Sequence, residues 1–232
     1  IKIDPDYREA HNNLGLAYGD SGRYEEAIES YKQAIKIDPD YAMAHNNLGL
    51  AYGELGKHEE AIKSHKQAIK IDPDYREAHY NLGVTYGDLG KHEEAFESYK
   101  QAIEIDPDYA DAHYNLGVAY GESGKYKEAI ESYKQAIRID PDDADAHINL
   151  GVAYYESGKY KEAIESFKQT IRIDPDDAMA HDNLGYTYYE SGKYKEAIES
   201  CKHAIRLDPD FANAHNNLGL AYGELGKHEE EI

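Results

Sequence analysis

Histidine and cysteine are the side chains of this 232-residue sequence best suited to hold a metal ion, and it contains twelve histidines and one cysteine. Seven histidines recur every 34 residues, and we call them the repeat histidines: His11, His45, His79, His113, His147, His181 and His215. If each lies on its own helix, neighbours are about 8 to 10 Å apart, whereas zinc needs every ligand atom within about 2.1 Å. We therefore predict no metal site and expect the repeat histidines to be buried and neutral. Acidification below about pH 6 should then destabilise the fold, because protonation would charge the core.

Nucleophilic side chains are the next candidates for chemistry, and serine recurs with the same period, at Ser30, Ser98, Ser132, Ser166 and Ser200. A catalytic nucleophile is expected to be unique, so these serines do not indicate an active site. Cys201 and His65 stand where other units carry Tyr31 or Phe167, which predicts a buried, inert thiol and a substitute for an aromatic ring. No phosphate-binding glycine loop follows a strand, because no strand is predicted. The sequence therefore predicts that the chain is not an enzyme and needs no cofactor.

A 34-residue period positions all of these side chains, and every proline follows it: Pro5, Pro39, Pro73, Pro107, Pro141, Pro175 and Pro209. After each repeat histidine, small and apolar residues recur at helical spacing, and a second such run follows the next glycine. Gly22 and its equivalents through Gly226 are expected to end the first helix of each pair, and Pro39 and its equivalents to end the second. Asp40 offers a carboxylate near the start of the following helix. The elements are therefore pairs of helices.

Charge and composition limit the classes of partner that the chain can bind. The chain has 25 Lys plus Arg against 46 Asp plus Glu, a formal net charge of −21, which would repel a nucleic acid backbone or an anionic membrane surface. No apolar run is long enough for membrane insertion. A single cysteine forms no disulfide within the chain, so the fold needs no oxidising compartment and a cytoplasmic location is our expectation. The sequence starts at Ile1 and stops at Ile232 in the middle of a pattern, as a piece of a longer protein would.

The repeated motif resembles that of a known family. It reads His-x-x-Leu-Gly-x-x-Tyr, then Gly, then Ala-x-x-x-Tyr-x-x-Ala, then Pro, and is similar to the tetratricopeptide repeat pattern. The resemblance implies an all-α fold, a right-handed superhelical solenoid of antiparallel helix pairs. We expect a single array over residues 1–232, with the end of a preceding repeat at 1–7, full repeats at 8–41, 42–75, 76–109, 110–143, 144–177 and 178–211, and a partial seventh repeat at 212–232.

Two departures from the family pattern stand out. Histidine replaces the tryptophan of the family in every unit, which makes that side chain smaller and able to titrate. Glu231 stands where other units carry alanine, so we expect the last half-helix to be frayed.

Asparagine recurs on the side of the first helix that does not pack against its partner, once in each unit: Asn13, Asn47, Asn81, Asn115, Asn149, Asn183 and Asn217. An amide carries a donor and an acceptor, as pairing with an extended peptide requires. This ladder is similar to the one in the superhelical repeat domains of O-linked N-acetylglucosamine transferases, which hold peptide backbones. The alternative is that duplication copied an asparagine that only bonds to the neighbouring repeat.

Three tyrosines lie on the same side of adjacent units, Tyr155, Tyr186 and Tyr189, where most other units carry glycine or an aliphatic residue. We predict that they form an anchor for a ligand, because aromatic side chains dominate the binding energy of interfaces. The alternative is that they pack on one another across repeats.

Acidic residues complete this side, with Asp20 or an equivalent acid in every unit. They favour a protein or peptide partner that is extended and neutral to basic, although solubility alone would also explain them. The sequence therefore predicts a scaffold that binds an extended peptide in an acidic, asparagine-lined groove. The alternative is a structural solenoid that forms a homo-oligomer by end-to-end stacking, since its two incomplete ends would nearly complete one repeat.

Overall fold

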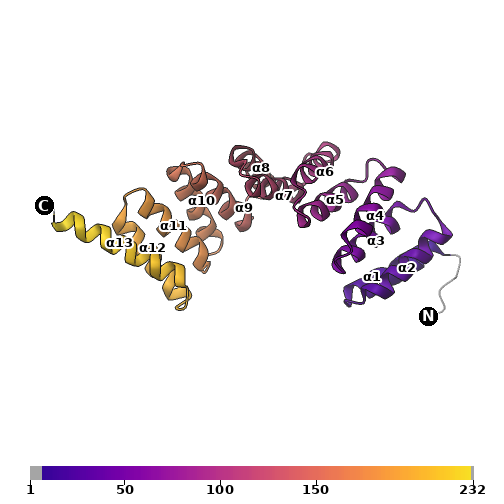
Figure 1. Ribbon diagram of the computed structural model, residues 1–232, viewed down its shortest axis with the longest axis horizontal. Coiled ribbons are helices and arrows are strands. Elements are labelled where there is room, and N and C mark those ends of the chain that lie inside the picture. Colours follow the sequence, from indigo (N-terminus) through magenta and orange to yellow (C-terminus); the bar gives the residue numbers. More distant parts are fainter. Residues whose placement is uncertain (1–6, 231–232) are drawn as a thin grey trace. The chain divides into compact units, whose positions relative to one another are not determined.

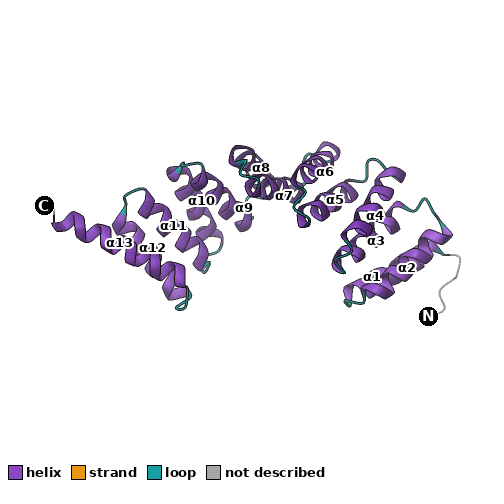
Figure 2. Cartoon of the chain, viewed as in Figure 1, coloured by secondary structure: helices purple, strands orange, loops and turns teal. Residues whose placement is uncertain are grey.

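The computed structural model describes residues 7–230, with side chains as far as Gly226. Within that range the chain forms only α-helices joined by short turns (Figure 2). They are α1 (Arg8–Asp20), α2 (Tyr24–Ile37), α3 (Ala42–Glu54), α4 (His58–Ile71), α5 (Arg76–Asp88), α6 (His92–Ile105), α7 (Ala110–Glu122), α8 (Tyr126–Ile139), α9 (Ala144–Glu156), α10 (Tyr160–Ile173), α11 (Ala178–Glu190), α12 (Tyr194–Leu207) and α13 (Ala212–Glu230). The predicted all-α class is confirmed.

The helices form two compact units, residues 1–119 and 120–232, and the boundary falls within α7. We call the odd-numbered helices A helices and the even-numbered ones B helices, so that α1 and α2 form repeat 1 and α11 and α12 form repeat 6. Within each unit, an A helix contacts the B helix that follows, and that B helix contacts the next A helix (Figure 1). Both units are therefore helical-repeat solenoids. That the two form one continuous array stays a prediction.

The tightest contact within a repeat joins a glycine of the A helix to a side chain of the B helix, and we call it the ring slot. A Cβ atom added to Gly15 would lie 2.4 Å from Cε1 of Tyr31, and one added to Gly49 would lie 2.6 Å from Cε1 of His65. The same slot takes Tyr99 in repeat 3, Phe167 in repeat 5 and Cys201 in repeat 6. Real Cβ atoms do not approach neighbours this closely, so only glycine permits the contact. The predicted roles of His65 and Cys201 as substitutes for a ring are confirmed.

Alanines surround the slot and bring the two backbones together. Ala27 and Ala34 of α2 are fully buried, and their equivalents on the other B helices are almost all equally inaccessible. The third residue of each A helix from α3 to α13 is also a fully buried alanine, such as Ala44. With so few side-chain atoms between the helices, dispersion contacts come largely from backbone against ring.

The turns follow the prediction in part. Gly22 has a φ of 72° and ends α1, and five equivalent glycines have the same left-handed backbone. Every B helix ends two residues before its proline, as expected. The carboxylate that caps the following turn differs from the one predicted, because Oδ1 of Asp38 accepts a hydrogen bond from the Asp40 amide at 3.1 Å. Asp40 is itself in the turn and exposed, and α3 has no side-chain cap, so the residue before the proline accepts the hydrogen bond.

The prediction that Gly226 ends the last A helix is wrong. Helix α13 continues through Gly226 to Glu230, and Gly226 lacks the positive φ of the other glycines. The expected fraying concerned Glu231, which lies outside the described residues.

The prediction that the repeat histidines are buried is also wrong, except for His181. His11, His45, His79, His113 and His147 are half-buried, and His215 is exposed. From His45 onward, Nε2 of each repeat histidine lies within hydrogen-bond distance of the carbonyl oxygen of the proline six residues earlier, as in His45 with Pro39 at 2.9 Å. A hydrogen-bonded place against the turn leaves the ring in contact with water, so these rings are not core groups.

His65 is the histidine that the core encloses. It is fully buried, its Nδ1 lies 3.0 Å from Oδ1 of Asn46, and its Nε2 has no hydrogen-bond partner among the described residues. Burial lowers the pKa of His65 to about 4. Burial also lowers the pKa of His181, so the expected titration belongs to His65 and, among the repeat histidines, to His181.

We predict that Gly49→Ala destabilises the protein by about 1 to 3 kcal/mol, because the new methyl group overlaps a ring that Asn46 holds in place. Gly53→Ala in the same helix is the matched control, since nothing lies within 4 Å of its Cβ position. It should be neutral or stabilising by up to about 1 kcal/mol through helix propensity. Urea unfolding followed by circular dichroism measures both, and equal stabilities for the two variants would contradict the ring slot.

We predict that His65→Tyr makes stability less dependent on pH. The folded-state pKa of His65 lies below its ordinary value of 6.5, so the unfolded chain binds more protons between pH 6.5 and 4 and stability falls as the pH falls through that window. From pH 7.5 to 5.5, both above the pI of 4.9, the wild type should lose about 1 kcal/mol more than the variant. Tyrosine fits, because it fills the slot in repeats 1 and 3. Parallel pH profiles for the two proteins would refute this role of His65.

Candidate functional site

The A helices form a continuous layer in each unit, because neighbouring ones contact each other: α1 with α3, α3 with α5, α9 with α11 and α11 with α13. We call the outward side of this layer the A-face. It carries the ladder asparagines, the acids equivalent to Asp20, and apolar residues that are well exposed to solvent. The last group comprises Leu16, Leu50, Val152 and Leu220. A surface that presents both amides and apolar groups suits a peptide, which offers the same two kinds of group.

The ladder asparagines bond across the seam between adjacent A helices. Nδ2 of Asn47 donates to Oδ1 of Asn12 at 3.0 Å, and Nδ2 of Asn81 donates to Oδ1 of Asn46 at 3.1 Å. Asn115 donates in the same way to the Tyr80 hydroxyl, and Asn217 to the Asp182 carboxylate. In these four repeats the amide nitrogen therefore holds neighbouring repeats together, which is the structural role that the sequence left open.

Asn183 differs from these four because of the residue it faces. The position that accepts the hydrogen bond, 35 residues earlier, is Ile148, which has no side-chain acceptor. No hydrogen bond of the Asn183 side chain occurs among the described residues, and the residue is half-buried. Its amide keeps both donor and acceptor on the A-face. Of the remaining two, Asn13 is exposed at the start of the layer and Asn149 is half-buried.

The three tyrosines of the predicted anchor do lie together, in a row that also includes two residues the sequence did not suggest. Ring centroids are 5.6 Å apart for Tyr155 and Tyr186 and 6.2 Å apart for Tyr186 and Tyr189. Tyr160 extends the row beyond Tyr155 at 5.5 Å, and Tyr194 extends it beyond Tyr189 at 5.9 Å. We call these five residues the tyrosine row. Tyr160 and Tyr194 begin B helices, so only the three-dimensional fold shows that they join it.

The tyrosine row is coupled to the ring slot. In repeat 1 the slot holds Tyr31, whose hydroxyl lies 4.0 Å from the Cβ position of Gly19 on the A-face. In repeat 5 the slot holds Phe167, which has no hydroxyl, and a tyrosine, Tyr155, replaces the glycine. Repeat 6 repeats this exchange with Cys201 and Tyr189. In repeats 5 and 6 the tyrosine is therefore on the A-face and not in the slot. Burial and a hydrogen bond to Tyr186 raise the pKa of Tyr155 there.

One acid of the A-face lies below the surface. Asp182 is only 5% exposed, and Asn217 donates to its Oδ1 at 2.9 Å. Burial raises the pKa of the Asp182 carboxyl, and no Lys or Arg pairs with it among the described residues. In repeats 1 and 2 the same position is a neutral asparagine, Asn12 or Asn46. An acid here adds negative potential to the part of the A-face that carries the tyrosine row.

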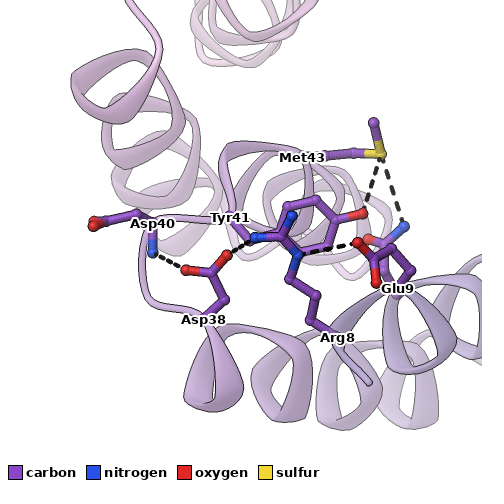
Figure 3. A network of polar contacts seen from close by, with 7 residues as sticks. Arg8, Glu9, Asp38, Asp40, Tyr41 and Met43 are labelled. Atoms are coloured by element: carbon purple, nitrogen blue, oxygen red, sulfur yellow. Dashed lines mark hydrogen bonds and ion pairs between the residues drawn. The ribbon is translucent and has the colours of Figure 1, made fainter. Parts of the chain in front are cut away.

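The arginines at the starts of α1 and α5 already pair with acids of the chain. Arg8 pairs with Asp38 and Glu9 and lies over the ring of Tyr41, with 4.7 Å between the guanidinium carbon and the ring centroid (Figure 3). The hydroxyl of Tyr41 also points at Sδ of Met43 (Figure 3). Arg76 repeats the arrangement on α5 with Asp106, Glu77 and Tyr109. Helices α9 and α11 contain no Lys or Arg at all, so the potential of the A-face is negative there.

The structure also has grooves on the B-helix side, which the sequence analysis did not predict. Between α8 and α10 lies a groove of about 400 Å³ with His147, Leu150 and Tyr154 at its floor. A similar groove of about 320 Å³ lies between α2 and α4 over His45, Leu48 and Tyr52. The repeat histidines therefore line the B-side grooves. The replacement of the family's tryptophan by histidine was the signal for this space, because the smaller ring leaves room.

Metal-ligating and thiol side chains are the candidates for metal and thiol chemistry in the part of the chain that the structure describes. No group of three or more metal-ligating side chains comes together there. Cys201 is fully buried, and burial raises the pKa of its thiol to about 12, which keeps it protonated and inert at neutral pH. Among the described residues, no helix has the length and hydrophobicity that crossing a membrane requires.

The pairing of helices, the ring slot and the repeating turns define a helical-repeat protein of the kind that serves as an interaction scaffold. A family model described as TPR repeat matches residues 20–56, 54–90, 85–124, 120–158, 153–192 and 185–226. The chain belongs to the tetratricopeptide repeat family, as its sequence motif suggested. No curated protein matches the sequence.

Solved structures share the fold. YrrB, described as a TPR protein with an unusual peptide-binding site, is 24% identical, with a TM-score of 0.73 over 82% of this chain and 97% of YrrB. The MamA protein is 30% identical, with a TM-score of 0.66 over 74% of this chain and 94% of that one. PilF of Pseudomonas aeruginosa is 20% identical, with a TM-score of 0.76 over 90% of this chain and 95% of that one. At 24% and 20% identity, YrrB and PilF are evidence for the fold alone.

Proposed function

We propose that the chain is a scaffold that holds an extended segment of another protein along its A-face, and that it catalyses no reaction. Tetratricopeptide repeats typically mediate protein–protein interaction, which supports the general role. The structural observation that carries the specific proposal is Asn183, a half-buried ladder amide whose side chain has no hydrogen bond among the described residues. A peptide group that runs past α11 would satisfy both its donor and its acceptor.

The surroundings of Asn183 support the same role. Tyr186 on the same helix and Val152 on the neighbouring A helix offer apolar area, and 39% of Val152 is exposed. The other ladder residues keep part of their capacity, since Asn47 and Asn81 donate through Nδ2 while their Oδ1 atoms accept no hydrogen bond among the described residues. A carbonyl oxygen of this kind accepts from a peptide N–H. The ladder therefore serves two purposes in the proposal, a seam between repeats and a row of acceptors.

Charge sets the class of partner. The acids of the A-face and the chain's net charge of −21 favour a neutral to basic segment and disfavour nucleic acid. YrrB, which has the same fold, is described as having a peptide-binding site. A cytoplasmic location belongs to the proposal as well, because the inert thiol of Cys201 needs no oxidising compartment.

The alternative, a solenoid that assembles end to end, depends on residues 1–6 and 227–232. These lie outside the part of the chain whose side chains are described, so end-to-end assembly stays a hypothesis. Peptide binding is the function that the A-face supports better.

We predict that Asn183→Ala weakens binding of a selected peptide about fivefold or more, the equivalent of one lost hydrogen bond of about 1 kcal/mol, and leaves stability unchanged. The probe is a 12-residue peptide selected on the wild-type chain from a random display library, and fluorescence anisotropy measures its affinity. Asn47→Ala is the matched control: it should lower the urea midpoint, because it leaves the buried amide of Asn12 without its partner.

The two variants separate the two roles of the ladder. If Asn183→Ala binds the peptide as tightly as the wild type, the amide does not contact the ligand and the proposed function loses its main support. If Asn183→Ala instead lowers the urea midpoint as much as Asn47→Ala does, then Asn183 is a structural residue like the other members of the seam.

A further inference from the structure

The helix pairs of repeats 5 and 6 do not need the tyrosine row in order to pack. Repeats 1 and 3 have glycine at the positions of Tyr155 and Tyr189, namely Gly19 and Gly87, and they form the same helix pair. The slot of repeat 5 is filled by Phe167, which is 1% exposed. Large aromatic side chains on the A-face of repeats 5 and 6 are therefore additions to a fold that is complete without them, which suits a binding role.

Two other tyrosines of this chain each have two lysine ammonium groups against the ring. Tyr154 lies between Lys134 and Lys159, with each ammonium nitrogen 5.8 Å from the ring centroid. Tyr188 lies in the same way between Lys168, at 6.0 Å, and Lys193, at 5.7 Å. These tyrosines are on the B-helix side, where the lysines are. Their π faces are occupied from within the chain.

The rings of the A-face lack such partners. Among the described residues, no Lys or Arg lies over Tyr155, Tyr186 or Tyr189, and α9 and α11 contain no cation that could reach them. Acids do surround them: Glu156 and Glu190 are exposed at the ends of α9 and α11, and the charge of Glu190 contributes to the raised pKa of Tyr155. Aromatic faces beside unpaired carboxylates form a receptor for a cation.

An arginine held by a ring and two acids already exists in the chain. The guanidinium of Arg8 lies over Tyr41 and pairs with Asp38 and Glu9 (Figure 3). Repeats 5 and 6 carry alanine in place of that arginine, Ala144 and Ala178, and the residues at the position of the facing tyrosine are Asp177 and Phe211. They have lost the internal cation and gained rings and acids nearby on the A-face.

We propose that the tyrosine row of repeats 5 and 6, together with Glu190 and its neighbouring acids, binds an arginine side chain of the extended partner segment. The inference rests on the proposed function, because it names the group that the segment presents at α9 and α11. A guanidinium fits better than an ammonium, since its flat face stacks on a ring while its edge donates to a carboxylate. The binding energy is then concentrated at one pair of repeats and is not spread evenly along the ladder.

The test compares two fluorescein-labelled 12-residue peptides of glycine and serine that differ at one central position, arginine or its uncharged isostere citrulline. Anisotropy titrations in low salt should give the arginine peptide at least about a fivefold tighter Kd. Because the net charge of −21 attracts any cation, the decisive protein variant keeps every charge: Tyr155→Gly, Tyr186→Leu and Tyr189→Gly combined, which installs residues native to repeats 1 and 2. This variant should bind both peptides about equally.

Smaller substitutions keep the test decisive if the triple variant does not fold. Tyr186→Leu alone should reduce the preference for arginine by about half or more, because leucine is native at the equivalent positions Leu16 and Leu50. Glu190→Gln should reduce it too, and Glu54→Gln, the same position in repeat 2, should not. A preference that persists unchanged in the tyrosine variants comes from net charge and overturns the inference. If citrulline and arginine peptides bind the wild type equally, the inference fails and the proposed function stands; if neither binds, both fail.

Discussion

The structure depends on the contact between a glycine of the A helix and one side chain of the B helix. Without a Cβ on the glycine, the ring of Tyr31 or Tyr99 lies against the backbone of the facing helix, and the alanines around it let the helices approach. The distance between the two backbones is therefore set once per repeat. Every other feature, from the turn at Gly22 to the layer of A helices, is positioned by this contact.

The slot also decides what the A-face can carry. Where tyrosine fills it, the hydroxyl reaches within about 4 Å of the A-face glycine, and that position stays small. Where Phe167 or Cys201 fills it, the A-face gains Tyr155 or Tyr189. The two substitutions occur together in repeats 5 and 6, whereas repeat 2 combines His65 in the slot with Gly53 on the A-face. The row of hydrogen bonds between neighbouring A helices also varies locally. Ile148 has no side-chain acceptor, so the Asn183 amide cannot donate to this position as the other ladder residues do.

The sequence allowed much of the fold to be predicted, because spacing alone determines which residues share a helix face. The helix pairs, the end of each B helix before its proline, and the roles of His65 and Cys201 followed from the 34-residue period. Burial of individual side chains did not follow, since it depends on neighbours from other repeats: the repeat histidines reach the turn carbonyls and stay half-exposed. The motif also predicted a turn at Gly226, but α13 continues through this residue, so the motif glycine alone does not determine where a helix ends. In the candidate site, the row of Tyr155, Tyr186 and Tyr189 was predictable, whereas Tyr160, Tyr194 and the bonds of the ladder amides required the structure.

Two surfaces of this protein are therefore able to receive a partner, the acidic A-face and the B-side grooves floored by residues such as His147. We place the ligand on the A-face because, among the described residues, no Lys or Arg lies over Tyr155, Tyr186 or Tyr189, whereas Tyr154 and Tyr188 on the B side each lie between two lysines. A crystal structure of the chain with a selected peptide tests this directly. We expect peptide electron density along α9 and α11, with a main-chain group within hydrogen-bond distance of Asn183 and a side chain over Tyr186. A peptide seated between α8 and α10, against His147 and Tyr154, would contradict it.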